Sequence, residues 1–242
     1  MVLALLGLAL AGCKRRDRAP TVAAVPVDAG PGNACPGPAA LALLVAPSGG
    51  AVHSDCYTLS VGRYWLAAAL TREAARSDAP RLQLLSGGFG PRVTAFDVQP
   101  APTDEIAALL REAPAVQVRL RSSRSDPSLV RIAVRAEHPD GQAREVAVLL
   151  QLVAHAPPRL LWSGPGDQVT LEGPCLVQRT VDFDMLFGRR LEMTTHTRAR
   201  GRDGKPHPAC TGGPGTQESL GARGIALPAG RPLGPGADAG PR

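Results

Sequence analysis

The chain has 242 residues and a formal net charge of +6 at neutral pH. Gly (27) and Pro (24) are abundant, whereas Phe, Trp and Tyr are scarce (4, 2 and 2). No long apolar run, Gly-X-Y repeat or sustained heptad is present, which excludes a multi-span membrane protein, a collagen and a coiled coil.

The chain begins with a segment typical of an export signal. Residues 2–11 are apolar or Gly, too short a run for a bilayer core of about 30 Å, and they end in Leu10-Ala11-Gly12-Cys13. This tetrad resembles the lipobox of bacterial lipoproteins. The resemblance implies diacylglyceryl attachment to the Cys13 thiol, removal of residues 1–12 as a signal peptide, and acylation of the new amine. Several acyl chains on one residue give stable membrane anchoring.

Composition divides the rest of the chain. All aromatic residues lie between positions 57 and 187, whereas 18 of the 42 residues from 201 to 242 are Gly or Pro. Aromatic side chains contribute the largest buried apolar area, so the packed core should lie in the middle of the chain. The predicted parts are a lipidated Cys and Pro-rich tether over 13–34, a single β-rich globular domain over 35–210, and a disordered Gly/Pro-rich tail over 211–242.

Charge follows the same division. Residues 14–18 carry +3 and residues 198–242 carry +4, which leaves −1 on residues 19–197. A nucleic-acid-binding protein concentrates positive charge on a folded face, so no nucleic acid partner is expected. The expected partners are the membrane, through the lipid anchor, and an envelope protein or polyanionic surface component.

Two helices are predicted in the first half of the domain. Residues 63–76 place Leu66, Leu70 and Ala74 at helical spacing. Thr103 can cap a second helix over 104–112, which has acidic residues in its first turn and an apolar stripe.

Residues 115–154 predict a three-stranded antiparallel meander with one buried face. Apolar residues alternate with polar ones around positions 116–121 and 130–135, and a longer apolar run follows at 146–153. Between the second and third strands, His138-Pro139-Asp140-Gly141 is strong turn chemistry. Further predicted strands are 81–85, 92–98, 159–162, 169–171, 176–183 and 190–197. The predicted fold class is therefore α+β or mostly β: an antiparallel sheet, about two short helices and a disordered C-terminal tail.

The polar face of the meander carries the candidate anion-binding residues. Guanidinium groups on a rigid sheet can hold phosphate or carboxylate groups through paired hydrogen bonds. The alternative is an ordinary solvated face, because acidic residues such as Glu137 and Glu145 lie in the same segment and can neutralise these charges. The candidates are Arg119, Arg121, Arg131 and Arg135.

Four cysteines remain after the lipobox. An even number in an exported protein favours two disulfides, and the simplest of the three connectivities is Cys35–Cys56 with Cys175–Cys210. The alternative is a zinc site, because two His-x-x-Cys pairs could supply two nitrogens and two sulfurs. That set is His53, Cys56, His207 and Cys210.

A pair of acidic residues is a further candidate for chemistry. Asp182-Phe183-Asp184 places two carboxylates on one side of a predicted strand, where they could ligate a cation or share acid and base roles. The Gly-rich segments 87–91 and 163–167 are interpreted as turns, and Trp162 as a core residue more than a ligand platform. No catalytic residue, metal or cofactor is assigned.

The resulting hypothesis is a lipid-anchored cell-envelope protein, periplasmic or surface-exposed. Its domain is expected to be a non-catalytic binding or structural module. The alternative is an envelope hydrolase or metal-dependent enzyme that uses His53 with Asp55, or Asp182 with Asp184.

Overall fold

The structure is a computed structural model, and it describes most of the chain from residue 35 onward. The described ranges are 35–46, 51–58, 64–72, 80–87, 93–98, 103–112, 115–123, 126–154, 156–186, 190–213, 215–221 and 224–233. The predicted signal peptide, lipobox and tether, including Cys13, lie outside them.

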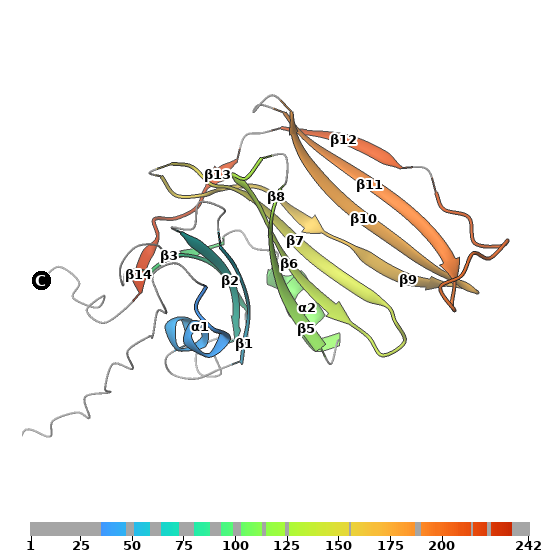
Figure 1. Ribbon diagram of the computed structural model, residues 1–242, viewed down its shortest axis with the longest axis horizontal. Coiled ribbons are helices and arrows are strands. Elements are labelled where there is room, and N and C mark those ends of the chain that lie inside the picture. Colours follow the sequence, from blue (N-terminus) through green and yellow to red (C-terminus); the bar gives the residue numbers. More distant parts are fainter. Residues whose placement is uncertain are drawn as a thin grey trace, which may run out of the picture.

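Two antiparallel sheets and two short helices make up the fold, as the composition and patterning predict (Figure 1). The first sheet has five strands in the order β1-β2-β3-β4-β14. Its bounds are β1 (Ala51–Thr58), β2 (Trp65–Arg72), β3 (Arg81–Gly87), β4 (Val93–Asp97) and β14 (Arg231–Leu233).

The second sheet has nine strands. The main order is β12-β11-β10-β9-β7-β6-β5, and β8 pairs with both β7 and β13. Its bounds are β5 (Ala115–Ser122), β6 (Leu129–Glu137), β7 (Ala143–Gln151), β8 (Arg159–Pro165), β9 (Gln168–Glu172), β10 (Cys175–Leu186), β11 (Arg190–Gly201), β12 (Thr216–Gly221) and β13 (Ile225–Ala226).

The predicted meander is confirmed as β5, β6 and β7, which pair antiparallel in sequence order. Gly141 closes the turn between β6 and β7 at a φ of 86°, where a residue without Cβ avoids strain. The six further predicted strands are also confirmed as β3, β4, β8, β9, β10 and β11. Alternation and turn residues therefore located most of the sheet.

The main core lies between the two sheets. Inward-facing side chains of the meander, such as Leu120, Ile132 and Val148, pack against Leu70 and Leu84 of the first sheet. All five are at most 5% exposed. The apolar face of the meander is buried here, so its arginine-bearing face is left on the outside.

The helix predicted over 63–76 is wrong where the structure describes it, because Trp65–Arg72 form strand β2; positions 63 and 73–76 lie outside the described residues. The strand lies between β1 and β3 in its sheet and is buried on both faces. Leu66 and Ala68 face the core between the sheets, whereas Trp65 and Ala67 face the opposite layer. A strand that is covered on both sides reads as a continuous apolar run, which periodicity alone does not separate from a helix.

The helices are α1 (Pro38–Val45) and α2 (Thr103–Glu112). The prediction of α2 is confirmed, and its Ile106 and Leu109 enter the core between the sheets. Helix α1 was not predicted; its Leu41 and Val45 pack on the outer face of the first sheet, against Ala67. The layers are therefore α1, the first sheet and the second sheet.

The domain continues beyond the predicted boundary at residue 210. Strand β12 pairs with β11, β13 with β8, and β14 with β4. The last pairing returns the chain to the first sheet, so the C-terminal segment joins both sheets. Gly and Pro are frequent there, but the edge strands require few side chains to be buried. Residues 234–242 lie outside the described part of the chain.

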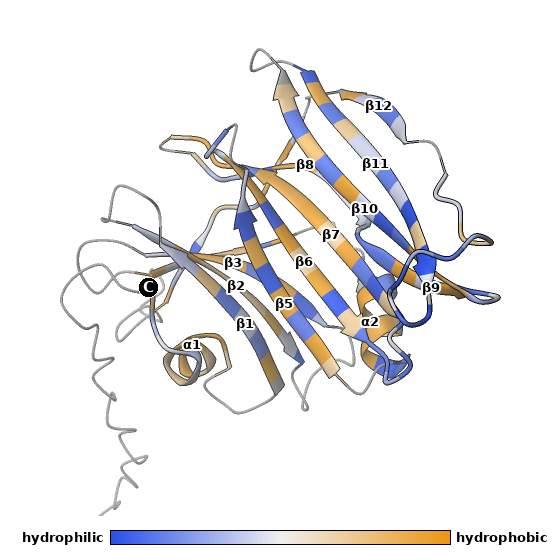
Figure 2. Cartoon of the chain, turned by 45° about the vertical axis from the view of Figure 1, so that its right-hand side comes forward, coloured by the Kyte–Doolittle hydropathy of each residue, from blue (hydrophilic) through white to orange (hydrophobic). Residues whose placement is uncertain are grey.

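Strands β10, β11 and β12 form a region that we call the ribbon. Strand β9 joins its lower part to β7, and beyond Arg179 strand β10 continues without that neighbour. In Figure 1 the ribbon extends away from the first sheet. Figure 2 shows hydrophobic colours along most of β6 and β7, whereas hydrophilic colours recur along β10 and β11. The ribbon is thus more polar than β6 and β7.

Candidate functional site

A groove lies between the ribbon and the outer face of the meander. It has a volume of about 580 Å³ and adjoins a second hollow of about 430 Å³. The two hollows share four lining residues: Arg121, Arg131, Asp182 and His196. We call the two together the polar groove. Its remaining lining residues are Ser122, Ser123, Leu129, Leu149, Asp167, Gln178, Thr180, Phe183, Asp184, Thr194 and Arg198.

The ribbon side of the groove follows from strand register. Asp182 of β10 is opposite Thr194 of β11, and Thr180 is opposite His196. Side chains that face each other across antiparallel strands lie on the same face of the sheet. The uninterrupted pairing therefore gathers Asp182, Thr194 and His196 on the side that faces the meander. One hairpin, β10 with β11, thereby supplies one whole wall of the groove.

The four predicted arginines share the outer face of β5 and β6. Arg121 is opposite Arg131, and Arg119 is opposite Ala133. They do not act as one cluster, because Arg119 and Arg135 both lie beside Glu137, at 3.9 and 2.8 Å. Only Arg121 and Arg131 line the groove. The neutralisation by acidic neighbours that the sequence allowed is therefore found at part of the predicted set.

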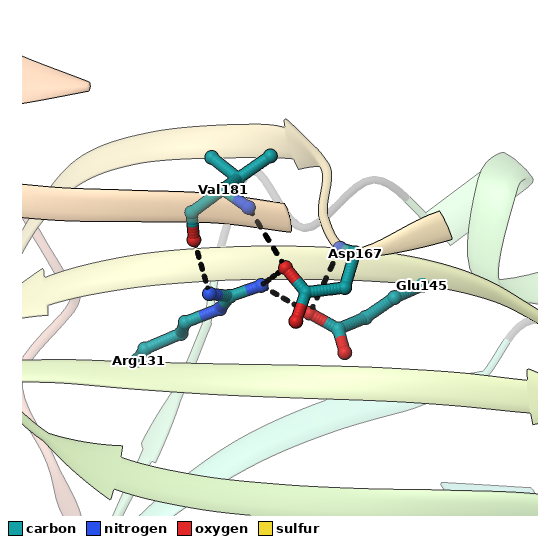
Figure 3. Close-up of polar contacts among 4 residues, drawn as sticks. All are labelled: Arg131, Glu145, Asp167 and Val181. Carbon is teal, nitrogen blue, oxygen red and sulfur yellow. Dashed lines mark hydrogen bonds and ion pairs between the residues drawn. The ribbon is translucent and has the colours of Figure 1, made fainter. Parts of the chain in front are cut away.

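Arg131 is the centre of a half-buried ionic cluster at the base of the groove (Figure 3). Its guanidinium donates to the carboxylate of Glu145, to Asp167 at 3.1 Å, and to the backbone carbonyl of Val181 at 2.6 Å. The Asp167 carboxylate also accepts the Val181 N–H at 2.9 Å. Two side chains thus satisfy both backbone groups of one residue in β10.

Burial and charge set the protonation of this cluster. The side chains of Arg131 and Glu145 are 18% and 4% exposed. Burial by itself would lower the pKa of Arg131, but the negative charges and hydrogen bonds of Glu145 and Asp167 raise it above its ordinary value. The arginine therefore stays protonated and holds β6, β7 and β10 together. Its charge is neutralised by the carboxylates of Glu145 and Asp167 and is not available to a ligand.

Close backbone approach makes room for this cluster. A Cβ added to Gly166 would lie 2.4 Å from the carboxylate oxygen of Glu145, and the Gly166 N–H donates to the Glu145 carbonyl at 2.8 Å. The segment 163–167, interpreted as a turn, instead continues strand β8 through Pro165 and leads directly into β9. Sequence reasoning missed Asp167, since a lone acid after Gly-Pro-Gly resembles an ordinary solvent-exposed turn residue.

Aromatic contacts support the same region. Trp162 of β8 and Phe183 of β10 have ring centroids 4.8 Å apart, and the Arg131 guanidinium lies 5.9 Å from the Phe183 ring. Both rings are half-buried. Trp162 therefore packs against the ribbon, as the core interpretation of this residue favours.

The remaining charged groups of the groove are exposed. Asp182, His196, Arg121 and Arg198 are solvent-exposed, and within the described part of the chain none of them forms an ion pair. His196 makes no hydrogen bond to Asp182 or to a hydroxyl among the described residues. Asp184 lies on the same face of β10 as Asp182, as predicted. The groove thus presents charges of both signs to solvent.

The predicted pair His53 and Asp55 lies elsewhere, on β1. The Asp55 carboxylate accepts the N–H of Cys56 at 2.9 Å and the N–H of Leu120 at 2.7 Å. Leu120 belongs to β5, so Asp55 satisfies a donor at the edge of the neighbouring sheet. This role is structural, and neither His53 nor Asp55 lines the groove.

The cysteines form the two disulfides of the simplest pairing, Cys35–Cys56 and Cys175–Cys210. The first joins the segment before α1 to β1, and the second closes the lower end of the ribbon. Both sulfurs of the alternative zinc set, those of Cys56 and Cys210, are therefore in disulfides and cannot act as thiolate ligands. Among the described residues no group of three or more His, Cys, Asp or Glu is placed to hold a metal ion.

No protein family model, curated protein or solved structure matches the chain. Among the described helices none is both long and apolar enough to cross a membrane.

Proposed function

We propose that this protein is a lipid-anchored cell-envelope protein whose folded domain is a non-catalytic binding module, with the polar groove as its binding site. The observation that carries the binding role is a groove of about 580 Å³ whose exposed Arg121, Asp182 and His196 are not consumed by partners in the described chain. Charged side chains that are held on rigid strands and left unpaired are poised to contact a ligand.

The anchor rests on different observations. The lipobox-like tetrad ending at Cys13 implies lipidation, and both disulfides favour an oxidising compartment outside the cytoplasm. Twenty-two peptide bonds separate Cys13 from Cys35, so this stretch of chain can span at most about 75 Å. The domain would then work close to the membrane surface.

The enzyme alternative uses the same groove. Asp182 and His196 line one wall together, but a general base must be oriented by a hydrogen bond, and His196 has none within the described residues. Asp55 is occupied by backbone donors. We therefore assign Asp182 and His196 to ligand contact and not to proton transfer.

Binding is tested by recording amide NMR shifts of the full-length chain carrying Cys13→Ala. The probes are three envelope-derived mixtures: peptidoglycan fragments, a polyanionic surface glycan, and peptides from digested envelope proteins. At least one mixture should shift resonances of β5, β10 and β11 saturably. Arg121→Gln should reduce that shift severalfold. Arg119→Gln is the matched control, since Arg119 is on the same strand and face but outside the groove. Failure of all three mixtures to perturb the groove would refute the binding role.

The anchor is tested by fractionation of cells that express the wild-type chain or Cys13→Ala. The wild-type protein should be found with membranes, and the substituted protein in the soluble fraction. Unchanged membrane association of Cys13→Ala would show that the lipobox interpretation is wrong.

A further inference from the structure

Among the described residues, one edge of β10 has no neighbouring strand where it borders the polar groove. Strand β10 pairs with β11 along its whole length, from Cys175 to Leu186. On its other side it pairs with β9 only as far as Arg179. Beyond that point no described strand pairs with this edge.

The backbone groups at this edge follow from strand geometry. In an antiparallel sheet successive residues direct their N–H and C=O groups alternately to the two neighbouring strands. Val181 directs both groups away from β11, since they bond to Asp167 and Arg131. The register of β10 with β11 has no irregularity, so Phe183 and Met185 direct their backbone groups to the same side as Val181.

At Val181, the side chains of Asp167 and Arg131 take the place of a neighbouring strand. Asp167 comes directly before β9, and its carboxylate accepts one hydrogen bond while Arg131 donates the other, as a paired residue would. At Phe183 and Met185 no such substitute is present among the described residues. An edge with unpaired N–H and C=O groups is a template for another extended chain.

The groove lies along this open edge. Asp182, Phe183 and Asp184 line it from β10, and the apolar side chains of Leu129 and Leu149 line it from the meander. Beyond Val181, whose backbone groups are bonded to side chains, the open segment runs from Asp182 to Leu186, and its five residues correspond to about 17 Å of extended chain. The site therefore combines backbone groups, an apolar floor and charged walls.

We infer that the polar groove binds an extended peptide that adds as a strand to the free edge of β10 at Phe183 and Met185, with an acidic side chain directed toward Arg121. This inference rests on the proposed binding function and specifies the ligand of the same groove. The exposed charges of the groove are the positive Arg121 and Arg198 and the negative Asp182 and Asp184, so both signs face a bound strand, and Arg121 is the group that an acidic side chain of the peptide would contact. Backbone pairing supplies affinity, and the charged walls select the sequence.

The test uses a phage-displayed library of random eight-residue peptides and the full-length chain carrying Cys13→Ala. The most enriched peptide is synthesised in three forms: unmodified, and N-methylated at alternate residues in either of the two registers. In a bound strand, alternate residues direct their N–H groups toward β10 and away from it, so methylation in only one of the two registers removes the hydrogen bonds to β10. Methylation in that register should lower affinity about tenfold or more, and methylation in the other should change it less than about twofold.

Variants of the protein give a second readout. Arg121→Gln should weaken the unmodified peptide severalfold, whereas Arg119→Gln should not. Met185→Pro removes one edge N–H and should also weaken binding. If Met185→Pro fails to fold, the methylated peptides still test strand addition, because they are measured against the protein without that substitution. Equal losses in both registers would refute strand addition.

Failure of this inference is distinguishable from failure of the proposed function. If no peptide is enriched but a glycan or peptidoglycan mixture still shifts groove resonances, strand addition is wrong and the binding module stands. If neither peptides nor any envelope mixture perturbs the groove, both proposals are wrong.

Discussion

The core and the ribbon are built from the same kind of element in opposite surroundings. In the core, strand β2 buries seven consecutive residues from Trp65 to Thr71. In the ribbon, β11 buries only Leu191, Thr195 and Gly201 of its twelve residues, and most of β12 is exposed. The core gains stability from apolar burial, whereas the ribbon depends on backbone pairing and a few local devices.

Two local interactions stabilise the ribbon. The Cys175–Cys210 disulfide closes the lower end of the ribbon, and the cluster of Arg131, Glu145 and Asp167 joins its middle to the meander. Between them the polar side chains remain exposed. A region that is held by few contacts can present charged groups and an open strand edge, which a fully packed core cannot do. We therefore propose binding for the ribbon, whereas apolar burial in the core supplies stability.

The largest effect is expected where the two regions join. Arg131→Met removes the cation between two partly buried carboxylates and should lower the free energy of unfolding by about 3 to 5 kcal/mol. Arg135→Met is the matched control: Arg135 is also 18% exposed, but its partner Glu137 is 42% exposed, so a loss of about 1 kcal/mol or less is expected. Chemical denaturation measures both. Equal losses would mean that burial of the carboxylate partners does not decide the cost.

A second test compares leucines of the two regions. Leu84→Ala, at a fully buried position of β3, should cost about 3 kcal/mol because it leaves a cavity between the sheets. Leu171→Ala in β9, which adjoins the ribbon and is only half-buried, should cost less than about 1.5 kcal/mol. Thermal or denaturant unfolding would show the difference. A larger loss at Leu171 would contradict the assignment of stability to the core.

A third test concerns the close approach beneath the groove. Gly166→Ala places a Cβ against the Glu145 carboxylate and should cost about 1 to 3 kcal/mol. Gly213→Ala is the control, since a Cβ at that exposed position would meet only the Thr197 Cβ, at an ordinary contact distance of 3.8 Å. Its expected change is within about 0.5 kcal/mol. A tolerated Gly166→Ala would show that the Glu145 side chain can move without loss of the cluster.

The smallest effect is a pH dependence that belongs to the first sheet. Burial would raise the pKa of Asp97, but hydrogen bonds from Arg81 and Gln83 and the charge of Arg81 lower it below its ordinary value. Stability from this group is therefore complete above about pH 4 and is lost as pH falls below that value. Asp97→Asn should unfold more easily at pH 6 and show a shallower loss between about pH 4 and pH 2. An unchanged acid slope would exclude this contribution.

Prediction from sequence succeeded where one face of a strand is solvated. The alternation around Leu120 and Ile132, and the turn at Gly141, identify the meander directly because period two and turn chemistry are local signals. The same method failed for β2, whose Ala67 and Ala68 are covered by different layers. That strand has no polar face, and only knowledge of both layers separates it from a helix.

The groove was predictable only in parts. The sequence indicated Arg121 and Arg131 as anion-binding candidates and the shared side of Asp182 and Asp184. It did not indicate that these two sets face one another, or that Asp167 would consume the charge of Arg131. The missing information is the pairing of β9 with β7 at Ala143 and Val169, which is non-local, whereas the pairing of β9 with β10 is a hairpin.

The sequence by itself determined the composition of the ends, the even number of cysteines after the lipobox-like tetrad, and most of the strands, because these depend on residue type and local spacing. Tertiary structure alone decided that the chain beyond residue 210 returns as β12, β13 and β14 to complete both sheets. It also decided which arginine is neutralised and which edge of β10 stays open. Those outcomes depend on register and on distances between strands far apart in the chain, and no local pattern encodes them.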